Sequence, residues 1–335
     1  MEYFRPITMT DPARPAGALT LAGGWCWFDR VEVLSRAASG RIIAAQELPA
    51  PVRHRLTALR AGFVGLALDR PRLMGILNVT PDSFSDGGQF LAPAAALVQA
   101  HAMAAGADIL DIGGESTRPG AAPVEIAEEI ARTAPLIAAL RAGGLTLPIS
   151  IDTRKAVVAE AALDAGADLV NDVAALTYDD DLGPLLAARR APVVLMHHQG
   201  RPETMQDDPR YDDVLLDVYD WLAERVAAAE AIGIARDRIA VDPGIGFGKT
   251  QSHNLALLRG LSLLHGLGCP ILLGASRKRF IGTIGGAVQA QARMPGSVAV
   301  ALAGVAQGVQ MVRVHDVAET RQALRLWQAI AGGQQ

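Results

Sequence analysis

Short hydrophobic runs alternate with stretches of helical periodicity along most of the chain. From Arg72 onward, eight apolar runs of the kind buried on both faces of a parallel sheet are each followed by such a stretch. We predict strands at residues 73–77, 107–113, 149–153, 169–172, 193–197, 239–242, 271–276 and 311–315. The predicted helices include residues 94–105, 126–141, 156–165, 214–232, 298–307 and 319–330. Eight strand–helix units favour an α/β fold of the closed (β/α)8 type, a TIM barrel, over an open doubly wound sheet.

Residues 1–70 lack this alternation. They contain Trp25 and Trp27, and residues 18–21 and 27–34 are expected to pair as a hairpin around Gly23-Gly24. A short helix is expected at residues 51–59, and the segment carries no constellation of reactive side chains. We therefore predict a small β-rich N-terminal appendage, residues 1–70, beside a catalytic barrel of residues 71–335. The N-terminal ends of barrel strands need a cover, so we expect the appendage to pack there or along the outer helices.

Composition narrows the class of protein further. The net charge of -4 and the pI near 6.0 give no basic footprint, so neither nucleic acid nor an anionic membrane is expected as the main partner. Cys26 and Cys269 lie far apart in apolar surroundings, which excludes a disulfide scaffold. The start of the chain has no basic-then-apolar pattern, and no apolar run reaches the roughly 18 residues of a membrane span. We expect a soluble, cytoplasmic protein.

Polar side chains occupy the end of every predicted strand. In chain order they are Asn78, Asp111, Asp152, Asn171, His197, Asp242, Ser276 and Arg313, several of them followed by further charged residues. An isolated strand-end carboxylate is usually a helix cap or an ion-pair partner. In a (β/α)8 barrel, however, all eight ends meet at one rim, where active sites lie. The sequence therefore predicts a binding cleft that is rich in both signs of charge.

Two motifs resemble known sites but lack the spacing that those sites need. Residues 244–250 end in Gly-Lys-Thr like a phosphate-binding loop, but Pro243 stands where the Walker spacing requires glycine. His197 and His198 are adjacent, so they point to opposite faces of an extended segment, and no third metal ligand follows nearby. Neither a Walker-type site nor a structural zinc site is expected.

Eight motifs, in order along the chain, resemble those of the dihydropteroate synthase family. They are MGILNVTPDSFSDGG, DIGGESTRPGA, SIDT, VNDV, LMH-x-QG, DPG-x-GFGK, SRK and RVHDV, and the similarity covers residues 71–330. The resemblance implies a folate-pathway transferase that joins 7,8-dihydropterin-6-ylmethyl diphosphate to 4-aminobenzoate, giving 7,8-dihydropteroate and diphosphate, and that sulfonamides inhibit. It also implies a homodimer formed through the late helices.

The resemblance also implies roles for individual residues. The pterin edge would be read by Asp152, Asn171, Asp242 and Lys278, with Arg313 stacked on the ring. The diphosphate would be held by Asn78, Thr117, Arg118, Arg313 and His315, with Mg2+ on Asn78. The aminobenzoate pocket would comprise Phe84, Thr117, Pro119, Phe247, Ser276 and Lys278. The catalytic set would be Asn78, Asp152, Lys278, Arg313 and His315.

The implied chemistry is departure of diphosphate to leave a cation delocalised into the pterin, followed by attack of the arylamine. An aromatic amine is uncharged at neutral pH, so the site needs no strong general base. Its work is positioning and neutralisation of the leaving group, aided by closure of loops 79–90 and 115–123. His198 departs from the family pattern, which often has methionine at this position.

Three alternatives remain open from the sequence. Asp152 and Asp242 could pair with Lys278 and Arg154 in a purely structural network, although buried ion pairs rarely stabilise a fold by themselves. A pterin-binding methyltransferase barrel would share Asp152, Asn171 and Asp242 but would not need a diphosphate site. An inactive pterin-binding homologue would have lost loop residues, whereas here Asn78 and the other implied phosphate ligands are all retained.

Overall fold

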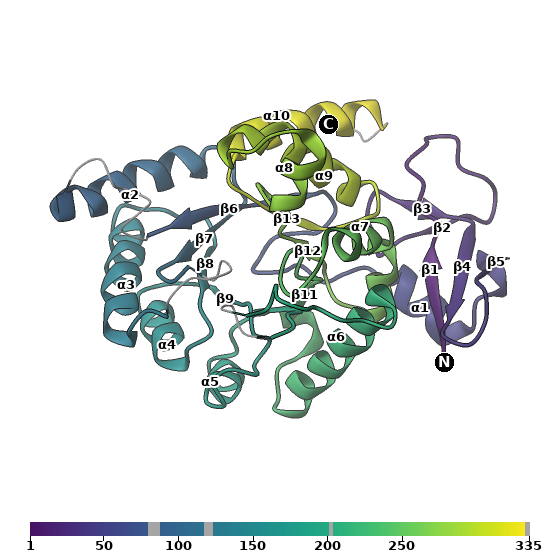
Figure 1. Ribbon diagram of the computed structural model, residues 1–335, viewed down its shortest axis with the longest axis horizontal. Helices are drawn as coiled ribbons and strands as arrows, with labels where there is room; N and C mark the ends of the chain where they lie inside the picture. Colours follow the sequence, from purple (N-terminus) through teal and green to yellow (C-terminus); the bar gives the residue numbers. More distant parts are fainter. Residues whose placement is uncertain (80–87, 117–122, 201–203, 332–335) are drawn as a thin grey trace.

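Eight parallel strands form the centre of the molecule. The computed structural model describes residues 1–79, 88–116, 123–200 and 204–331 (Figure 1). The strands are β6 (Arg72–Asn78), β7 (Ile109–Gly113), β8 (Ile149–Asp152), β9 (Leu169–Asp172), β10 (Val193–Met196), β11 (Ile239–Asp242), β12 (Leu272–Leu273) and β13 (Met311–Val314). Their order in the sheet is β11-β10-β9-β8-β7-β6-β13-β12. A parallel bridge between Val241 and Ile271 brings the two edges together, so the predicted barrel is confirmed.

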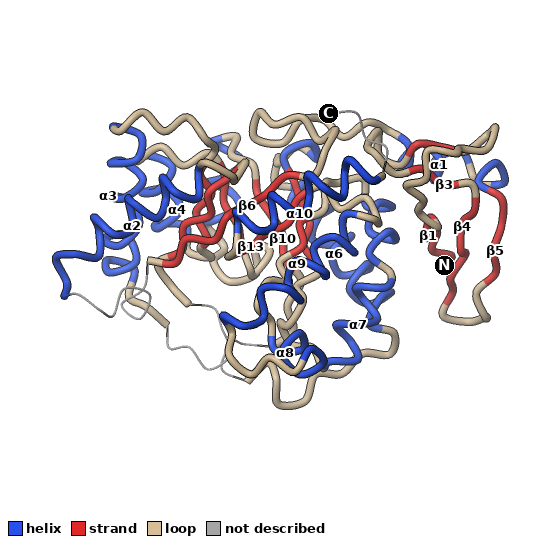
Figure 2. The backbone as a smooth tube through the Cα atoms, turned by 90° about the horizontal axis from the view of Figure 1, so that it is seen from above, coloured by secondary structure: helices blue, strands red, loops and turns tan. Residues whose placement is uncertain are grey.

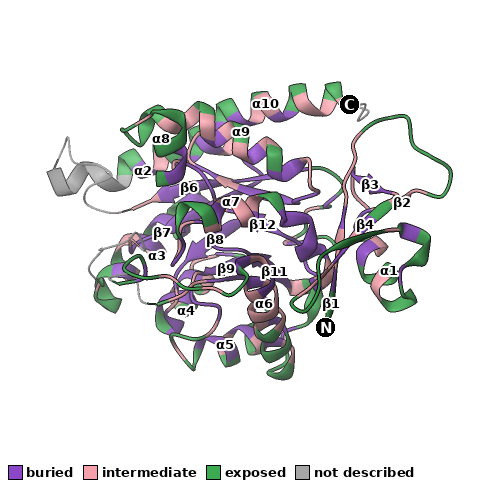
Figure 3. Cartoon of the chain, turned by 45° about the vertical axis from the view of Figure 1, so that its right-hand side comes forward, coloured by how far each residue is buried: buried purple, intermediate pink, exposed green. Residues whose placement is uncertain are grey.

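Helices surround this barrel on the outside. They are α2 (Gly88–Ala104), α3 (Ile126–Ala142), α4 (Ala156–Asp164), α5 (Leu182–Arg189), α6 (Val214–Ala231), α7 (Gln251–Arg259), α8 (Arg279–Gly285), α9 (Met294–Val305) and α10 (Val317–Ile330), with a 3-10 helix, η4, at Leu261–Leu267. Figure 3 shows buried strands beneath helices whose outer faces are exposed. In the ranges that the structure describes, no helix combines the length and apolar character needed to cross a bilayer.

Most predicted strands have nearly the predicted bounds, and β9 and β11 match them fully. The largest difference is β12, which has two residues where 271–276 was predicted. At the end of that segment the Ser276 hydroxyl accepts a hydrogen bond from the His315 backbone N–H at 3.2 Å. The Ser276 hydroxyl thus accepts the hydrogen bond that a backbone carbonyl would accept in a continuing strand. The chain then turns toward α8.

The N-terminal end of the barrel is filled by the segment that precedes β6. Phe63 and Leu68 are 1% and 4% exposed. They pack in one apolar cluster with seven strand residues, namely Met74, Ile109, Leu169, Val194, Ala240, Leu272 and Met311. We call residues 63–68 the plug. Phe63 and Leu66 exchange two backbone hydrogen bonds of 2.9 Å, which hold the plug as a tight turn. The segment provides the expected cover.

The remaining N-terminal residues form two small sheets and a helix. Strands β1 (Glu2–Pro6), β4 (Arg30–Ser35) and β5 (Arg41–Ala44) pair antiparallel in the order β1-β4-β5. The predicted hairpin is present as β2 (Leu19–Thr20) and β3 (Trp27–Phe28), and the predicted helix as α1 (Ala50–Thr57). The segment 27–34 was predicted as one strand but is divided between β3 and β4.

This appendage packs on the outer wall of the barrel, at one end of the molecule (Figures 1 and 2). Tyr3 Oη donates to Asp220 in α6 at 2.7 Å, and Ser262 Oγ in η4 donates to the Pro6 carbonyl at 2.8 Å. Trp25 Nε1 donates to the Val305 carbonyl at the end of α9 at 2.8 Å. These contacts agree with the expectation that the appendage lies along outer helices.

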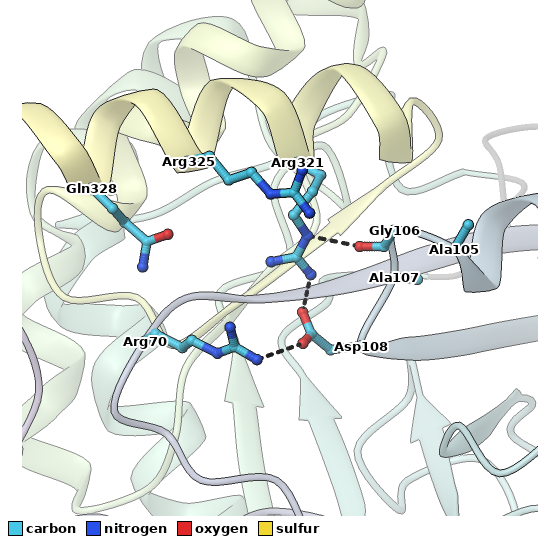
Figure 4. Close-up of a pocket in the computed structure, with 8 residues that line it drawn as sticks. All are labelled: Arg70, Ala105, Gly106, Ala107, Asp108, Arg321, Arg325 and Gln328. Carbon is cyan, nitrogen blue, oxygen red and sulfur yellow. Dashed lines mark hydrogen bonds and ion pairs between the residues drawn. The ribbon is translucent and has the colours of Figure 1, made fainter. Parts of the chain in front are cut away.

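A set of ion pairs marks the end of the barrel opposite the polar rim. Asp108, directly before β7, accepts from the Leu73 N–H at 2.8 Å and pairs with Arg72 at 3.4 Å and with Arg321 of α10. Asp108 and Arg321 also line a pocket of about 200 Å3, together with Arg70 and Arg325 (Figure 4). The carboxylate therefore fastens α10 to the start of β6 and β7.

Truncating the plug should destabilise the barrel without changing its chemistry. Phe63→Ala is expected to lower the free energy of unfolding by about 3 kcal/mol, because it leaves a cavity under the strand layer. The KM values for the two substrates that the resemblance implies should change little. Urea unfolding and steady-state kinetics test this, and a stable variant with weakened substrate binding would show that the plug communicates with the rim.

Candidate active site at the strand ends

The sheet register places the predicted site residues side by side. Asn78 at the end of β6 pairs with Gly113 of β7, Gly113 pairs with Asp152 of β8, and Asp152 pairs with Asn171 of β9. Asp242 ends β11 level with Met196 of β10. Because the strands are parallel and in this register, residues far apart in sequence reach one rim at the same height.

A buried charge cluster lies at the centre of this rim. Arg313 from β13 donates to Asp111 Oδ2 at 2.5 Å through Nε and to Asp152 Oδ2 at 2.6 Å through Nη2. Asn171 Nδ2 also donates to Asp111 Oδ2, at 3.3 Å. Among the described residues, neither Asp111 Oδ1 nor Asp152 Oδ1 has a hydrogen-bond partner, although both are buried. The cluster therefore has unused acceptors of the kind that ligand N–H groups would satisfy.

Two carboxylates here share one guanidinium, and their electrostatics follow from that. Burial raises the pKa of Asp152 to about 7; Arg313 opposes this rise, and the Asp111 carboxylate adds to it. The two carboxylates in turn hold the pKa of Arg313 above its usual value, although burial alone would lower it. Arg313 was predicted to stack on the pterin ring, and here its guanidinium lies between the two carboxylates.

A second group of site residues gathers on the turn after β11. Asp242 Oδ1 accepts from the Gly244 N–H at 2.7 Å, and burial raises the pKa of Asp242 while Lys278 and Arg313 moderate the rise. Lys278 Nζ lies 4.1 Å from the centre of the Phe247 ring, which is cation–π range. The structure thus brings Asp242, Phe247 and Lys278 together.

Ser276 and His315 form a third contact, between the ends of β12 and β13. The His315 Nδ1 and Ser276 Oγ atoms are 3.0 Å apart, and Ser276 Oγ also accepts from the His315 backbone N–H. Arg277 forms an ion pair with Asp316 beside them. The serine therefore fixes the orientation of the imidazole ring.

His198 is directed away from the carboxylate cluster, toward the loop after β9. Its Nε2 lies 3.3 Å from Thr177 Oγ1, its Nδ1 lies 3.1 Å from the Gly200 carbonyl, and its ring packs edge-on against Trp221. Burial lowers the pKa of this imidazole. At neutral pH the side chain is therefore uncharged, and its contacts are with Thr177, Gly200 and Trp221.

The structure pairs Asp152 with a different cation from the Arg154 of the structural-network alternative. Arg154 pairs with Glu115 at 3.1 Å and stacks over Tyr178 at 4.0 Å, whereas Asp152 pairs with Arg313. Arg154 belongs instead to a separate network around Glu115.

That network clamps both ends of the loop between β7 and α3. Lys155 Nζ lies 2.6 Å from Glu115 Oε2, 2.7 Å from Glu129 Oε2 and 2.6 Å from the Val124 carbonyl. Glu115 Oε2 also accepts from the Val124 N–H at 2.9 Å. Burial alone would raise the pKa of Glu115, but Lys155, the Val124 N–H and Arg154 together hold it below its usual value.

Three residues of this rim, Asp111, Lys155 and Lys249, form buried contacts although no individual role was predicted for them. Asp111 and Lys155 carried a signal, because a charged residue inside an apolar strand or directly before a helix needs a partner. Four assigned residues, Phe84, Thr117, Arg118 and Pro119, lie outside the described residues. Asn78 is half-buried beside Gly113, and a Cβ atom placed on that glycine would lie 3.8 Å from the Asn78 amide oxygen.

Known proteins resemble this chain over most of its length. Residues 74–315 match the family described as pterin binding enzyme, so the chain belongs to the pterin binding enzymes. The dihydropteroate synthase of Neisseria meningitidis serogroup B is 50% identical over 280 residues, which cover 81% of this chain and 96% of the relative. That of Escherichia coli is 45% identical over 274 residues, covering 81% and 95%.

Solved structures give the same result. The Xanthomonas albilineans dihydropteroate synthase with 4-aminobenzoic acid has a TM-score of 0.75 at 49% identity, covering 79% of this chain and 94% of that one. The same organism's enzyme in complex with 7,8-dihydropteroate has a TM-score of 0.72 at 46% identity, covering 79% and 95%. Within the pterin binding enzymes, the chain belongs to the dihydropteroate synthase family.

Proposed function

We propose that this chain condenses 7,8-dihydropterin-6-ylmethyl diphosphate with 4-aminobenzoate, releasing diphosphate and 7,8-dihydropteroate for folate biosynthesis. The observation that carries the proposal is the buried cluster of Asp111, Asp152 and Arg313, which leaves two carboxylate oxygens without partners among the described residues. Such a cluster strains the ligand-free fold, since buried acceptors without donors cost stability. A ligand edge with several N–H groups relieves that strain.

The pterin is proposed to bind between this cluster and Asp242. The ring N–H and amino groups of the pterin would donate to the carboxylates of Asp152 and Asp242, and Asn171 would complement the neighbouring position on the edge. Lys278 would donate to an acceptor on the ring. Arg313 already lies against Asp152, one of the two carboxylates proposed to hold the pterin, so its guanidinium plane would be available to the ring from that side.

Aminobenzoate is proposed to bind on the side of Phe247 and Lys278. The ring of Phe247 offers an apolar face, and Lys278 places a positive charge 4.1 Å from its centre, which suits an aromatic carboxylate. Ser276 would supply a hydroxyl nearby. Phe84, Thr117 and Pro119 are proposed to complete this pocket, where sulfonamides would compete with aminobenzoate.

The diphosphate group is proposed to lie near Asn78, Arg313 and His315, with Thr117 and Arg118. A Mg2+ ion would be held by the amide oxygen of Asn78, by substrate oxygens and by water, a ligand set that suits a hard octahedral ion. The described residues contain no group of three His, Cys, Asp or Glu side chains that could hold a metal on their own, which fits an ion bound mainly through substrate. Such an ion would neutralise charge on the leaving diphosphate.

The residues themselves would act by holding and neutralising the substrates. Arg313 and His315 would stabilise negative charge as the bond to diphosphate breaks, while Asp152 and Asp242 would stabilise the positive charge that spreads into the pterin. Lys278 and Phe247 would place the arylamine nitrogen in line with the methylene carbon. Positioning of this kind supplies up to roughly 7–11 kcal/mol of barrier reduction in well-oriented cases.

Incorporation of radiolabelled aminobenzoate into dihydropteroate tests the proposed function. The wild-type chain should incorporate label only when the pterin diphosphate is present, with one diphosphate released for each label incorporated. Methyl transfer from methyltetrahydrofolate without any incorporation would instead support the methyltransferase alternative. Pterin binding without either reaction would support an inactive homologue.

Binding of the second substrate should depend on the first subsite. If diphosphate and Mg2+ organise the rim, a sulfonamide should bind the ligand-free chain poorly and bind well once both are added. Isothermal titration calorimetry with and without EDTA measures this. Equally strong binding in EDTA would contradict the proposed order and the proposed metal.

Three organisational proposals accompany this function. We propose a catalytic domain of residues 71–335 carrying an appendage of residues 1–70, and a cytoplasmic location, supported by two buried cysteines that form no disulfide. We also propose a homodimer through the late helices, supported by Leu326 and Ile330 of α10, which are 61% and 83% exposed. Sedimentation equilibrium of the wild type and of Leu326→Glu tests the dimer.

A further inference from the structure

We propose that Lys249 is a positioning residue that sets the aminobenzoate side of the active site by holding the turn that carries Phe247. Neither the predicted roles nor the Gly-Lys-Thr pattern of residues 248–250 gave this lysine a function. The inference rests on the proposed assignment of Phe247 to the aminobenzoate pocket.

Lys249 is buried beneath the turn and bonded to two neutral acceptors. Its side chain belongs to a residue that is only 3% exposed. Its Nζ lies 2.9 Å from the Phe247 carbonyl oxygen and 2.8 Å from His197 Nδ1. The ammonium group of Lys278 lies 4.1 Å from the centre of the ring of the same Phe247. Lys249 is therefore in direct contact with Phe247, a residue that we place against the substrate.

The turn around Phe247 is pressed closely against the chain that follows β10. Gly244 and Gly248 have φ values of 66° and 61°, in the left-handed region. A Cβ atom at Gly244 would lie 1.8 Å from the His197 carbonyl oxygen, and one at Gly248 would lie 2.4 Å from the Gln199 carbonyl oxygen. Side chains hold this turn: Asn254 accepts from the Gly246 N–H, Tyr211 donates to the Gly248 carbonyl, and Lys249 donates to the Phe247 carbonyl.

Lysine at this position is unusual for the chain. Of 31 cationic residues only Lys155, Lys249 and Lys278 are lysines, and all the others are arginines. Lys155 clamps the loop after β7 and Lys278 contacts Phe247, so each of the three lies near the rim. Lysine offers a single ammonium on a flexible stem, whereas arginine carries a planar fork of donors.

The energetics indicate a role in geometry rather than in stability. Burial lowers the pKa of Lys249 to about 7; Asp242 opposes this shift and Lys278 adds to it. A cation buried against a carbonyl and an imidazole costs stability, because neither acceptor is charged. A lysine that only supported the fold would be expected to stabilise it. If Lys249 instead positions Phe247, the wild-type fold should be no more stable than one with an apolar residue at this position.

Lys249→Met separates these two roles. We expect its KM for aminobenzoate to rise about tenfold, as expected for loss of one hydrogen bond from a charged donor. The KM for the pterin diphosphate should change less than about twofold, and the melting temperature should stay the same or rise. Lys249→Gln, which keeps a donor, should recover part of the aminobenzoate affinity. Leu186→Ala is the control, because it creates a cavity under α5 and not at the turn. It should lower the melting temperature and leave both KM values unchanged.

A double-mutant cycle with Phe247→Ala shows whether Lys249 acts through Phe247. If it does, Lys249→Met should have little further effect on the KM for aminobenzoate in the Phe247→Ala background. Additive effects, an unchanged KM in Lys249→Met, or a lowered melting temperature with both KM values unchanged would each overturn the inference. A wild-type chain that fails to incorporate aminobenzoate would instead contradict the proposed function, so the two failures are distinguishable.

A measurement on the wild type covers the case in which Lys249→Met does not fold. Donation from Lys249 to Nδ1 requires His197 to carry its proton on Nε2. Ring 15N chemical shifts, assigned by comparison with His197→Gln, should show that tautomer at pH 6. A proton on Nδ1 would contradict the proposed hydrogen bond.

Discussion

Replacing Asp152 by asparagine is expected to abolish turnover and, at the same time, to stabilise the ligand-free protein at pH 8. The folded state raises the pKa of Asp152 from 3.8 to about 7, chiefly through burial. A carboxyl group with a raised pKa contributes stability that is fully present below pH 4 and is lost as the pH rises through 7. At pH 8 the ionised carboxylate therefore destabilises the fold, and an amide, which mimics the neutral acid, does not.

The expected gain in the free energy of unfolding is about 2 kcal/mol at pH 8 and close to zero at pH 4. Turnover should fall at least a thousandfold, roughly 4 kcal/mol of transition-state stabilisation, because the pterin loses a charged acceptor. Urea unfolding at both pH values and the incorporation assay measure the two effects. A variant that is less stable at pH 8 but active would show that Asp152 serves the fold instead.

Asp172 offers a matched control on the next strand. Burial raises its pKa to about 6, but both of its oxygens accept backbone N–H groups, from Ala174 at 2.7 Å and from Leu176 at 2.6 Å. Asp172→Asn loses one of these acceptors, which offsets the gain from removing a buried charge, so at pH 8 it should stabilise the protein less than Asp152→Asn does. The same substitution is thus expected to give a clear gain in stability at Asp152 and little or none at Asp172.

Lys155→Met should cause the largest loss of stability of any single substitution at the rim. It removes the one ammonium that lies between the buried carboxylates of Glu115 and Glu129. Breaking a buried ion pair from one side typically costs about 3–5 kcal/mol, because it leaves charge buried without compensation. Thermal and urea unfolding at pH 8 measure the loss.

A second substitution should recover much of this loss. Glu115 keeps its ion pair with Arg154 after Lys155 is removed, so the uncompensated charge lies mainly on Glu129. Lys155→Met combined with Glu129→Met should therefore be more stable than Lys155→Met alone. Arg189→Met, which removes an exposed ion pair with Asp164, should change stability little. Equal losses of stability in the single and double variants would contradict the claim that Lys155 compensates the charge of Glu129.

The barrel itself could be predicted because each strand is a short apolar run bounded by polar residues. Strands β9 and β11 lie at the predicted residues for this reason. The rim could be predicted because parallel strands place their carboxyl ends together, and the register of Asn78, Asp152 and Asn171 follows from that rule. Local sequence pattern was sufficient for both.

Pairings between distant residues could not be predicted in this way. Arg313 and Asp111 are 202 residues apart, and nothing in either segment indicates that the guanidinium lies between two carboxylates. The bounds of β12 depend on a hydroxyl that bonds the neighbouring strand, and the plug at Phe63 depends on the shape of the barrel it fills. Features of this kind arise from packing between segments, which periodicity within one segment does not record.

A crystal structure with 7,8-dihydropteroate bound would test the account most directly. We predict that the pterin edge lies within hydrogen-bonding distance of Asp152, Asn171 and Asp242, and that the benzoate ring lies against Phe247 with its carboxylate toward Lys278. Asp152 Oδ1, which has no hydrogen-bond partner among the described residues, should gain one. Dihydropteroate bound at the opposite end of the barrel, near Arg70 and Arg321, or bound without contact to Asp152 and Asp242, would contradict the proposed site.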